Sequence, residues 1–265
     1  MKSRVAILYI CTGKYSVLWE GFYQSFQKFF LKNSIVEYFV FTDAKKIPYE
    51  EEKNVHKYYQ KNLGWPNNTL RRFDIFLRIE DILKDFQYVY FINANMRCVR
   101  PITEENFLPL KDEENLVVVQ HAGYYQKKVT EYPYERNPQS LAYVPIERAK
   151  YYVMGSLNGG KSNCYMEMVR KLSINTEKDW KNGIVALWHD ESHLNRYILD
   201  RKDVKILPPS YCAAEELEYP FEPYMILLDK SKIFDVEAAK TSGVKGRIKL
   251  LRQRAKEHIK KLIKK

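Results

Sequence analysis

The stretch "YVYFINANMR", residues 88–97, determines how the rest of this sequence is interpreted. Its first five residues, 88–92, are apolar and predict a buried strand. Asn93 and Asn95 follow with only Ala94 between them, so two neutral amides stand where the strand should end. In open α/β sheets ligands bind beyond the carboxyl ends of the strands, which makes this strand end a candidate ligand site.

Four further apolar runs predict strands, and helical patterns lie between them. Alternating strands and helices predict an α/β domain with a mostly parallel, Rossmann-like central sheet flanked by helices. No GxGxxG or GxxxxGK[ST] follows the first strand, which argues against a dinucleotide fold or a P-loop. The predicted strands are residues 5–10, 36–42, 116–120 and 204–207, and the helical patterns are residues 18–30 and 70–86.

Positive charge is concentrated at the C-terminus. Residues 245–265 contain ten Lys or Arg and one Glu, a net +9 of the total +11, which leaves +2 for the other 244 residues. Apolar residues recur there at spacings of three and four, which predicts a basic amphipathic helix. We therefore divide the chain into a main domain, 1–243, and a basic tail, 244–265. This pattern is consistent with binding to the anionic inner surface of a membrane. It is equally consistent with a charged helix packed on its own domain or with a frayed end.

Cysteine usage and hydropathy favour a cytoplasmic protein. The four cysteines are widely scattered without CxxC spacing, which fits a reducing compartment better than a disulfide framework. The apolar run near the N-terminus is only seven residues long and lacks the cleavage site of a signal peptide. No run approaches the roughly 20 apolar residues of a membrane-spanning helix.

The densest polar stretch is "ALWHDESHLNRY", residues 186–197. Asp190, Glu191 and Ser192 stand where a helix should begin, and the helix dipole stabilises ionised carboxylates there. Ordinary helix capping explains the same three residues. Both interpretations remain open at this point.

A zinc site is a weaker interpretation of the same stretch. His189 and His193 are four residues apart and would share one face of a helix. The zincin pattern needs Glu directly after the first His, however, and Asp190 holds that place. The other imidazoles of the chain are His56, His121 and His258.

The segment "YYVMGSLNGG", residues 151–160, is rich in glycine. Gly155, Gly159 and Gly160 would let the backbone approach a ligand closely. A loop with tight turns accounts for these glycines equally well.

In chain order, FxNxN, "HAGYY", "YERNPQSLAY", "YYVMGSLNGG" and "WHDESHLNRY" together resemble the family 6 glycosyltransferases, which include the histo-blood-group A and B transferases and α1,3-galactosyltransferase. The resemblance covers roughly residues 5–232. It implies a GT-A fold with a single catalytic domain, and retaining transfer of Gal or GalNAc from a UDP-sugar. The implied product has an α1,3 bond to a galactose acceptor, often one that bears an α1,2-linked fucose.

The resemblance also implies roles for individual residues. Glu191 matches the carboxylate beneath the anomeric carbon, and Asp190 matches a residue that holds the donor sugar. Met154 and Ser156 match positions that tune Gal against GalNAc; because Ser156 is small, we expect UDP-GalNAc, with UDP-Gal as the alternative. The expected donor-binding residues are Thr12, Tyr15, Arg72, Asn93, Ala94, Asn95, Met154, Ser156, Asp190, Lys230 and Lys232.

Acceptor binding is expected at His121 and Trp188. The family's acidic acceptor contact falls on Ala214, and the adjacent Glu215 is the expected substitute. The expected acceptor is a fucosylated galactoside.

The family's metal-binding DxD motif is NAN in this chain, which is a marked departure. Mn²⁺ and Mg²⁺ prefer anionic oxygens, and an amide offers a dipole without a charge. We therefore expect no metal and no other cofactor, as in bacterial members of the family that carry NxN. Lys230 and Lys232, with Arg72 and Arg97 nearby, would then stabilise the departing UDP. Solvated surface positions are the alternative for the two lysines.

Two other classes of function remain open from the sequence. The basic tail suits nucleic-acid binding, but the main domain is nearly neutral and has no RNA-binding motif. A sugar-binding protein without activity is the other, and the intact setting of Glu191 and Trp188 argues against it. We expect no nucleic-acid partner.

Overall fold

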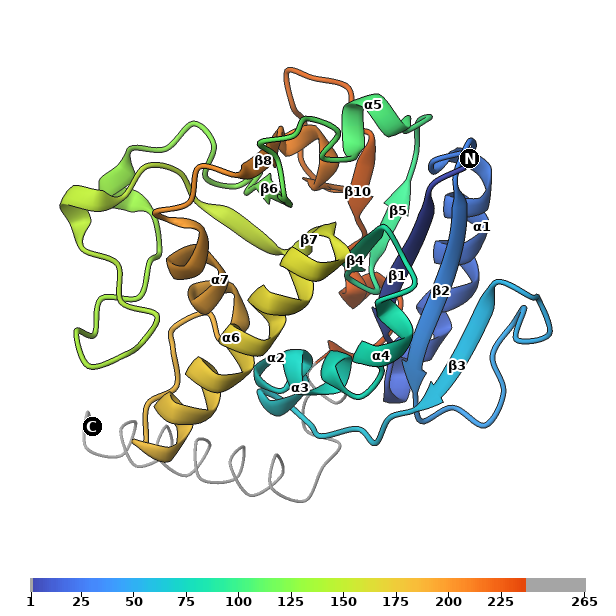
Figure 1. Ribbon diagram of the computed structural model, residues 1–265, viewed down its shortest axis with the longest axis horizontal. Helices are drawn as coiled ribbons and strands as arrows, with labels where there is room; N and C mark the ends of the chain where they lie inside the picture. The colour runs from blue at the N-terminus through green and yellow to red at the C-terminus, as the bar shows by residue number, and fades with distance from the viewer. Residues whose placement is uncertain (1, 237–265) are drawn as a thin grey trace, which may run out of the picture.

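The computed structural model describes residues 2–236 of the chain (Figure 1). The predicted basic tail at 244–265 lies outside these residues, and so does the domain boundary at 243. Its contact with an anionic membrane therefore stays a prediction from the sequence. Among the described residues, none of the helices combines the length and the apolar character that a bilayer-spanning segment needs.

A mixed sheet of seven strands, in the order β3-β2-β1-β4-β7-β6-β8, forms the centre of the described chain. Only β7 runs antiparallel to its neighbours, β4 and β6, and the other pairings are parallel. The α/β class with a mostly parallel sheet, expected of the GT-A fold, is thus confirmed. The strands are β1 (Arg4–Ile10), β2 (Ile35–Thr42), β3 (Val55–Tyr59), β4 (Tyr88–Ile92), β6 (Leu116–Gln120), β7 (Val153–Lys161) and β8 (Val204–Leu207).

A second, smaller sheet carries the end of the described chain back to the strand end at residue 93. Its order is β5-β10-β9, with β10 antiparallel to β5. Because β5 begins directly after the NAN motif, this pairing brings residues 225–228 up to that motif. The strands are β5 (Met96–Cys98), β9 (Ala213–Ala214) and β10 (Met225–Leu227).

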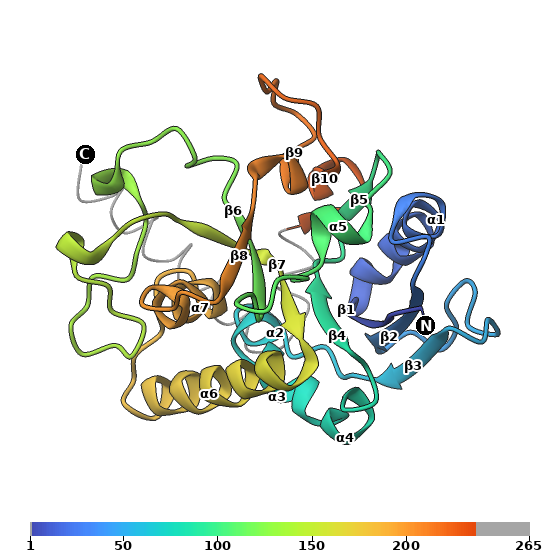
Figure 2. The same cartoon turned by 45° about the horizontal axis from the view of Figure 1, so that its top comes forward.

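Helices cover both faces of the large sheet (Figure 2). Alternate residues of β1 point to opposite faces: Ile7 packs in the core under α1, and Leu8 packs in the core under α3 and α6. The α-helices are α1 (Trp19–Phe29), α2 (Asn67–Leu70), α3 (Arg72–Leu77), α4 (Glu80–Leu83), α5 (Glu104–Phe107), α6 (Ser162–Lys181) and α7 (Asp190–Ile198). The 3₁₀ helices are η1 (Gly13–Leu18), η2 (Val129–Glu131), η3 (Ile146–Arg148), η4 (Pro209–Tyr211) and η5 (Lys230–Lys232).

One predicted helix, and one of the two open interpretations of the glycine-rich segment, are wrong. Residues 70–86 do not form one helix, because the backbone leaves helical geometry at Arg71 and again at Ile79. The glycine-rich segment 151–160 is mainly strand β7 instead of a loop. A side chain at Gly159 would come within 2.2 Å of the Tyr90 ring on β4, so glycine is needed there for packing between strands.

Candidate active site

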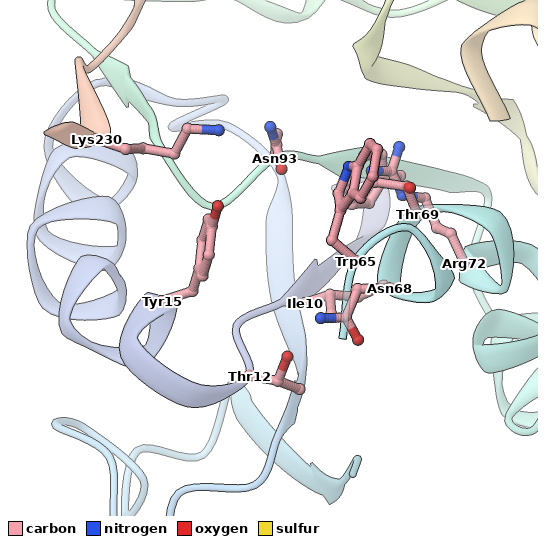
Figure 3. Close-up of a pocket in the computed structure, with 10 residues that line it drawn as sticks. Ile10, Thr12, Tyr15, Trp65, Asn68, Thr69, Arg72, Asn93 and Lys230 are labelled. Carbon is pink, nitrogen blue, oxygen red and sulfur yellow. The ribbon is translucent and has the colours of Figure 1, made fainter. Parts of the chain in front are cut away.

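A cavity of about 210 Å³ opens at the carboxyl ends of β1 and β4, where the sequence predicts ligand binding. Figure 3 shows Tyr15 and Lys230 on one side of it and Trp65, Thr69 and Arg72 on the other, with Asn93 between them. The residues that line it are Ile10, Thr12, Tyr15, Trp65, Asn68, Thr69, Arg72, Phe91, Asn93 and Lys230.

Strand β7 is irregular where it passes this cavity. Val118 of β6 pairs with Asn158, but the next residue, Val119, pairs with Met154. Residues 155–157 of β7 therefore form a bulge in the pairing with β6. The backbone of Gly155 becomes available to three side chains: its N–H donates to Glu191 Oε2 (2.7 Å), and its carbonyl accepts from Arg72 Nη1 (3.2 Å) and from Asn158 Nδ2 (3.1 Å).

Glycine at position 155 eases this approach. A Cβ atom there would lie 3.1 Å from Glu191 Cβ, which is tighter than ordinary van der Waals contact. The bulge thus lets β7 meet the first turn of α7 directly. Asn195, one turn later in α7, stabilises the same contact. Its Oδ1 accepts from the Val153 N–H (3.0 Å), and its Nδ2 donates to the Val153 carbonyl (2.9 Å).

The two predicted donor-selecting residues also lie on this part of β7. Met154 is half-buried, whereas Ser156 is buried and its hydroxyl has no protein hydrogen-bond partner. The carbonyl of Ser156 accepts from the backbone N–H of Asn93 (2.8 Å). Ser156 is therefore adjacent to the NAN motif.

Arg72 and Asp190 form a buried ion pair. The guanidinium also lies over the ring of Phe91, 4.0 Å from its centroid, so an aromatic face and a carboxylate both stabilise its charge. Burial raises the pKa of Asp190, and Arg72 opposes that rise. Helix α7 begins at Asp190 as predicted, and this carboxylate links the helix to α3.

Glu191 occupies a site built for one carboxylate. Its Oε1 accepts from the hydroxyl of Tyr152 (2.6 Å), and its Oε2 accepts from the Gly155 N–H. Burial raises the pKa of Glu191 to about 7, while the two donors act in the opposite direction. The group therefore changes its charge within the physiological pH range.

His189 and His193 lie in different environments. His189 precedes α7 with a positive φ of 54° and places its ring edge-on to Trp65. His193 is buried on the other side of the helix turn, with Nε2 3.6 Å from Asp179. No three His, Cys, Asp or Glu side chains between residues 2 and 236 gather as metal ligands, so the zinc interpretation finds no support there.

The NAN motif forms a hydrogen-bonded turn. The amide nitrogen of Asn93 donates to Asn95 Oδ1 (3.1 Å), and Asn93 Oδ1 accepts from the N–H of Ala94 (3.1 Å). The Ala94 carbonyl accepts hydrogen bonds from the Tyr9 hydroxyl and the Arg97 guanidinium, which stabilise the turn. Both amide oxygens thus have N–H partners, and the pair carries no charge. The pair therefore offers a divalent cation no anionic oxygen.

The predicted cationic residues are placed differently. Lys230 lines the cavity, with Nζ 5.6 Å from the centroid of the Tyr15 ring. Lys232 is exposed, and its ammonium lies 3.3 Å from the carboxylate of Glu216. Arg97 donates to the carbonyls of Leu18, Ala94 and Met96 and is not among the residues that line the cavity.

Of the expected acceptor residues, His121 lies beside Tyr152, Trp188 precedes α7, and Glu215 contacts Asp229. His121 Nδ1 accepts from the N–H of Gly123 (3.0 Å), and burial lowers the pKa of this imidazole to about 4. The ring is therefore neutral at pH 7 with its proton on Nε2, which makes Nε2 a donor. The ring of His121 is 5.8 Å from that of Tyr152. Trp188 is half-exposed, and Glu215 accepts from the N–H of Asp229 (3.0 Å).

Comparison with known proteins identifies the family. The sequence profile described as Glycosyltransferase family 6 matches residues 2–232. This chain belongs to glycosyltransferase family 6. Its predicted class, a glycosyltransferase, is thereby confirmed.

Several family 6 relatives are similar over most of the chain. One is the O-antigen biosynthesis glycosyltransferase WbnI of Escherichia coli, with 32% identity over 86% of this chain and 95% of that protein. Another is globoside alpha-1,3-N-acetylgalactosaminyltransferase 1 of Gallus gallus, with 28% identity over 84% of this chain and 65% of that protein. A third is histo-blood group ABO system transferase 2 of Rattus norvegicus, with 26% identity over 80% and 64%. The chain thus spans slightly less than two thirds of these two animal proteins.

The structure gathers most of the family 6 positions that the sequence predicts around one site. Thr12, Tyr15, Arg72, Asn93 and Lys230 line the cavity, and the first turn of α7 adjoins it through the Arg72–Asp190 pair. Lys232 and Glu215 do not line the cavity. Lys232 follows Asp229 by three residues, and Glu215 accepts a hydrogen bond from the N–H of Asp229.

Sequence reasoning missed six residues of the site. Ile10, Trp65, Asn68, Thr69 and Phe91 line the cavity, and Tyr152 binds Glu191. A signal existed for Asn68 and Thr69, since they precede Arg72 by four and three residues and would share its side of a helix. Tyr152 stands in the stretch 151–160, but its partner is 39 residues away in sequence and does not follow from that stretch.

The ion pair at Arg72 predicts a difference in stability between two adjacent arginines. Arg72→Ala leaves Asp190 buried without its partner, which should lower the free energy of unfolding by about 3–5 kcal/mol. Arg71→Ala is the matched control: its pair with Glu177 is partly exposed, and the loss should be about 1 kcal/mol or less. Urea unfolding at pH 7 measures both values, and equal losses would contradict the assignment.

Proposed function

We propose that this family 6 enzyme transfers GalNAc from UDP-GalNAc to the 3-hydroxyl of a galactose acceptor, with retention of configuration and without a metal. The observation that carries the proposal is the partly buried Glu191 carboxylate, held by Tyr152 and Gly155 beside the Arg72–Asp190 pair. A rigid carboxylate of this kind suits a reacting sugar carbon that becomes positively charged. Transfer of Gal from UDP-Gal by the same site is the alternative.

The proposed reaction begins when the bond between the anomeric carbon and UDP breaks and its electron pair leaves with the diphosphate. Glu191 faces the resulting positive charge, either forming a covalent glycosyl intermediate or stabilising the cation electrostatically. The acceptor 3-hydroxyl then attacks the face that UDP left, which retains the configuration. Asp190, neutralised by Arg72, is placed to accept hydrogen bonds from the donor's hydroxyls.

Protein cations take the place of a metal ion in this proposal. The diphosphate gains negative charge as it departs, and preorganised cations stabilise that charge. Lys230 is the best-placed group, because it lines the cavity opposite Arg72 while Lys232 is paired with Glu216 outside it. The neutral amides of Asn93 and Asn95 avoid the repulsion that two carboxylates would exert on the diphosphate.

The proposed donor preference rests on Ser156. Its side chain is small and adjoins the NAN motif, which would leave room for a substituent of the donor sugar. An N-acetyl group at C2 is such a substituent. On the acceptor side, the Nε2 donor of His121 and the exposed face of Trp188 suit the hydroxyls and the apolar face of galactose. A fucosylated galactose is the acceptor that the family resemblance favours.

A competition assay tests the proposed function directly. UDP-GalNAc and UDP-Gal are supplied together with an α1,2-fucosylated galactoside, in the presence of EDTA. We expect α1,3-linked GalNAc as the main product, with a ratio of kcat/KM values of about tenfold, as one pocket contact allows. A large loss of turnover in EDTA would contradict the metal-free mechanism, and a predominance of Gal in the product would establish the alternative donor.

The two C-terminal lysines should differ in catalysis. Lys230→Ala removes a charge beside the diphosphate and should lower kcat about 100-fold, the usual effect of losing one preorganised group. Lys232→Ala is the matched control, and its kcat should stay within about threefold of wild type because Lys232 faces Glu216. Steady-state kinetics in EDTA compare the variants; equal effects of both changes would rule out a special role for Lys230.

The titration of Glu191 predicts the acid limb of the pH profile. The ionised form is needed, and its pKa is raised to about 7, so kcat/KM should fall to half near pH 7 and decline further as pH falls. Tyr152→Phe removes a donor to the carboxylate, which raises the pKa and should move the midpoint to higher pH. Tyr132→Phe is the control, since Tyr132 packs 6.2 Å from the Tyr152 ring. Glu191→Gln should abolish most turnover, and a mild effect would show that another carboxylate acts.

A further inference from the structure

The second amide of the NAN motif binds the segment that carries Lys230. Asn95 Nδ2 donates to the carbonyl of Leu228 (2.8 Å), and the N–H of Leu228 donates to the carbonyl of Asn95 (2.8 Å). These two bonds extend the β5–β10 pairing by one residue, since Met96 is the partner of Leu227. Asn95 is buried, so its side-chain bond is shielded from water.

The first amide of the motif sets the direction of this contact. Asn93 Nδ2 donates to Asn95 Oδ1, which leaves the NH₂ group of Asn95 facing Leu228. Asn93 is itself oriented by the N–H of Ala94, which donates to its Oδ1. The result is a chain of three hydrogen bonds from the turn at the cavity to the C-terminal segment.

Residues 228–234 form a short strap across one side of the cavity. Lys230 follows Leu228 by two residues, and the ring of Phe234 packs edge-on against Tyr15 (4.9 Å between centroids). The carboxylate of Glu215 accepts from the N–H of Asp229, which ties the strap at a second point. Because the strap has only short 3₁₀ structure of its own, its position depends on these ties.

We propose that Asn95 is a positioning residue: its side-chain amide anchors the strap at Leu228 and thereby places Lys230 beside the donor diphosphate. A carboxylate at position 95 would point a second acceptor at the Leu228 carbonyl, losing the bond and adding repulsion. The catalytic part of the inference rests on the proposed function of Lys230. The anchoring itself is a property of the chain alone.

Hydrogen–deuterium exchange measures the anchoring without reference to activity. Asn95→Asp should speed exchange of the amides at residues 228–232 by about tenfold or more. Asn54→Asp is the matched control, because Asn54 Nδ2 donates to the carbonyl of Val36 at the opposite end of the strands. It should leave exchange at 228–232 unchanged. Unchanged exchange in Asn95→Asp would overturn the anchor, and Asn95→Ala provides the same comparison if the carboxylate variant does not fold.

A double-mutant cycle in EDTA measures the catalytic consequence. Asn95→Asp and Lys230→Ala should each lower kcat about 100-fold, and the double variant should be no more than about threefold below the worse single variant. Multiplying losses would overturn the positioning role, because Asn95 would then act independently of Lys230. If Lys230→Ala alone leaves kcat unchanged, the proposed role of the lysine fails, while the exchange experiment still decides whether Asn95 anchors the strap.

Discussion

The backbone of Gly155 is the constraint on which the geometry of the site depends. Its N–H and carbonyl bind Glu191 and Arg72, and Arg72 in turn holds Asp190. Three charged side chains from α3 and α7 are therefore positioned by the two backbone groups of one residue of β7. Both groups are available because the strand bulges there, and glycine eases the close approach of α7. A regular β7 would direct both groups of Gly155 into the ladder.

This arrangement gives the two adjacent carboxylates different properties. Asp190 has a buried guanidinium as its partner, whereas Glu191 has only neutral donors, from Tyr152 and Gly155. Burial consequently raises the pKa of Glu191 to about 7, and its ionisation is finely balanced. A carboxylate that is weakly stabilised in the resting site interacts most strongly when positive charge appears beside it. Burial also keeps His121 neutral, and because its Nδ1 accepts from Gly123, its Nε2 carries the proton and can donate.

The sequence predicts the part of the fold that depends on local apolar runs. β4, β6 and β8 agree with the predicted strands, and β1 and β2 differ by one residue at their starts. The sequence does not predict β7, because its glycines are required by packing against neighbouring strands and form no local strand pattern. Gly159, for example, leaves space for the Tyr90 ring on β4. The helix expected at 70–86 fails for a related reason, since propensity does not reveal where tertiary contacts interrupt a helical run.

The site was predictable where a motif carries it and not where packing creates it. Asn93, Asp190 and Glu191 stand in recognisable stretches, so the resemblance located them. Trp65 stands in no such stretch. Tyr152 stands in one, but only its contact with Glu191 on another element reveals its role. Lys230 and Lys232 are equivalent in the sequence, and only the course of the strap separates the lysine at the cavity from the one beside Glu216.

The hydrogen bonds of the NAN turn explain why both positions of the motif are amides in this chain. Asn93 must donate to Asn95, and Asn95 must donate to Leu228, so each position needs an N–H group. A carboxylate at 93 could not donate to Asn95 Oδ1, so two acceptors would face each other. The Asn95 amide would then have to rotate, and its NH₂ group would lose the hydrogen bond to the Leu228 carbonyl. A carboxylate at 95 would break the same bond directly. The two positions are therefore coupled: one aspartate alone would disrupt the strap without creating an anionic pair that could attract a divalent cation.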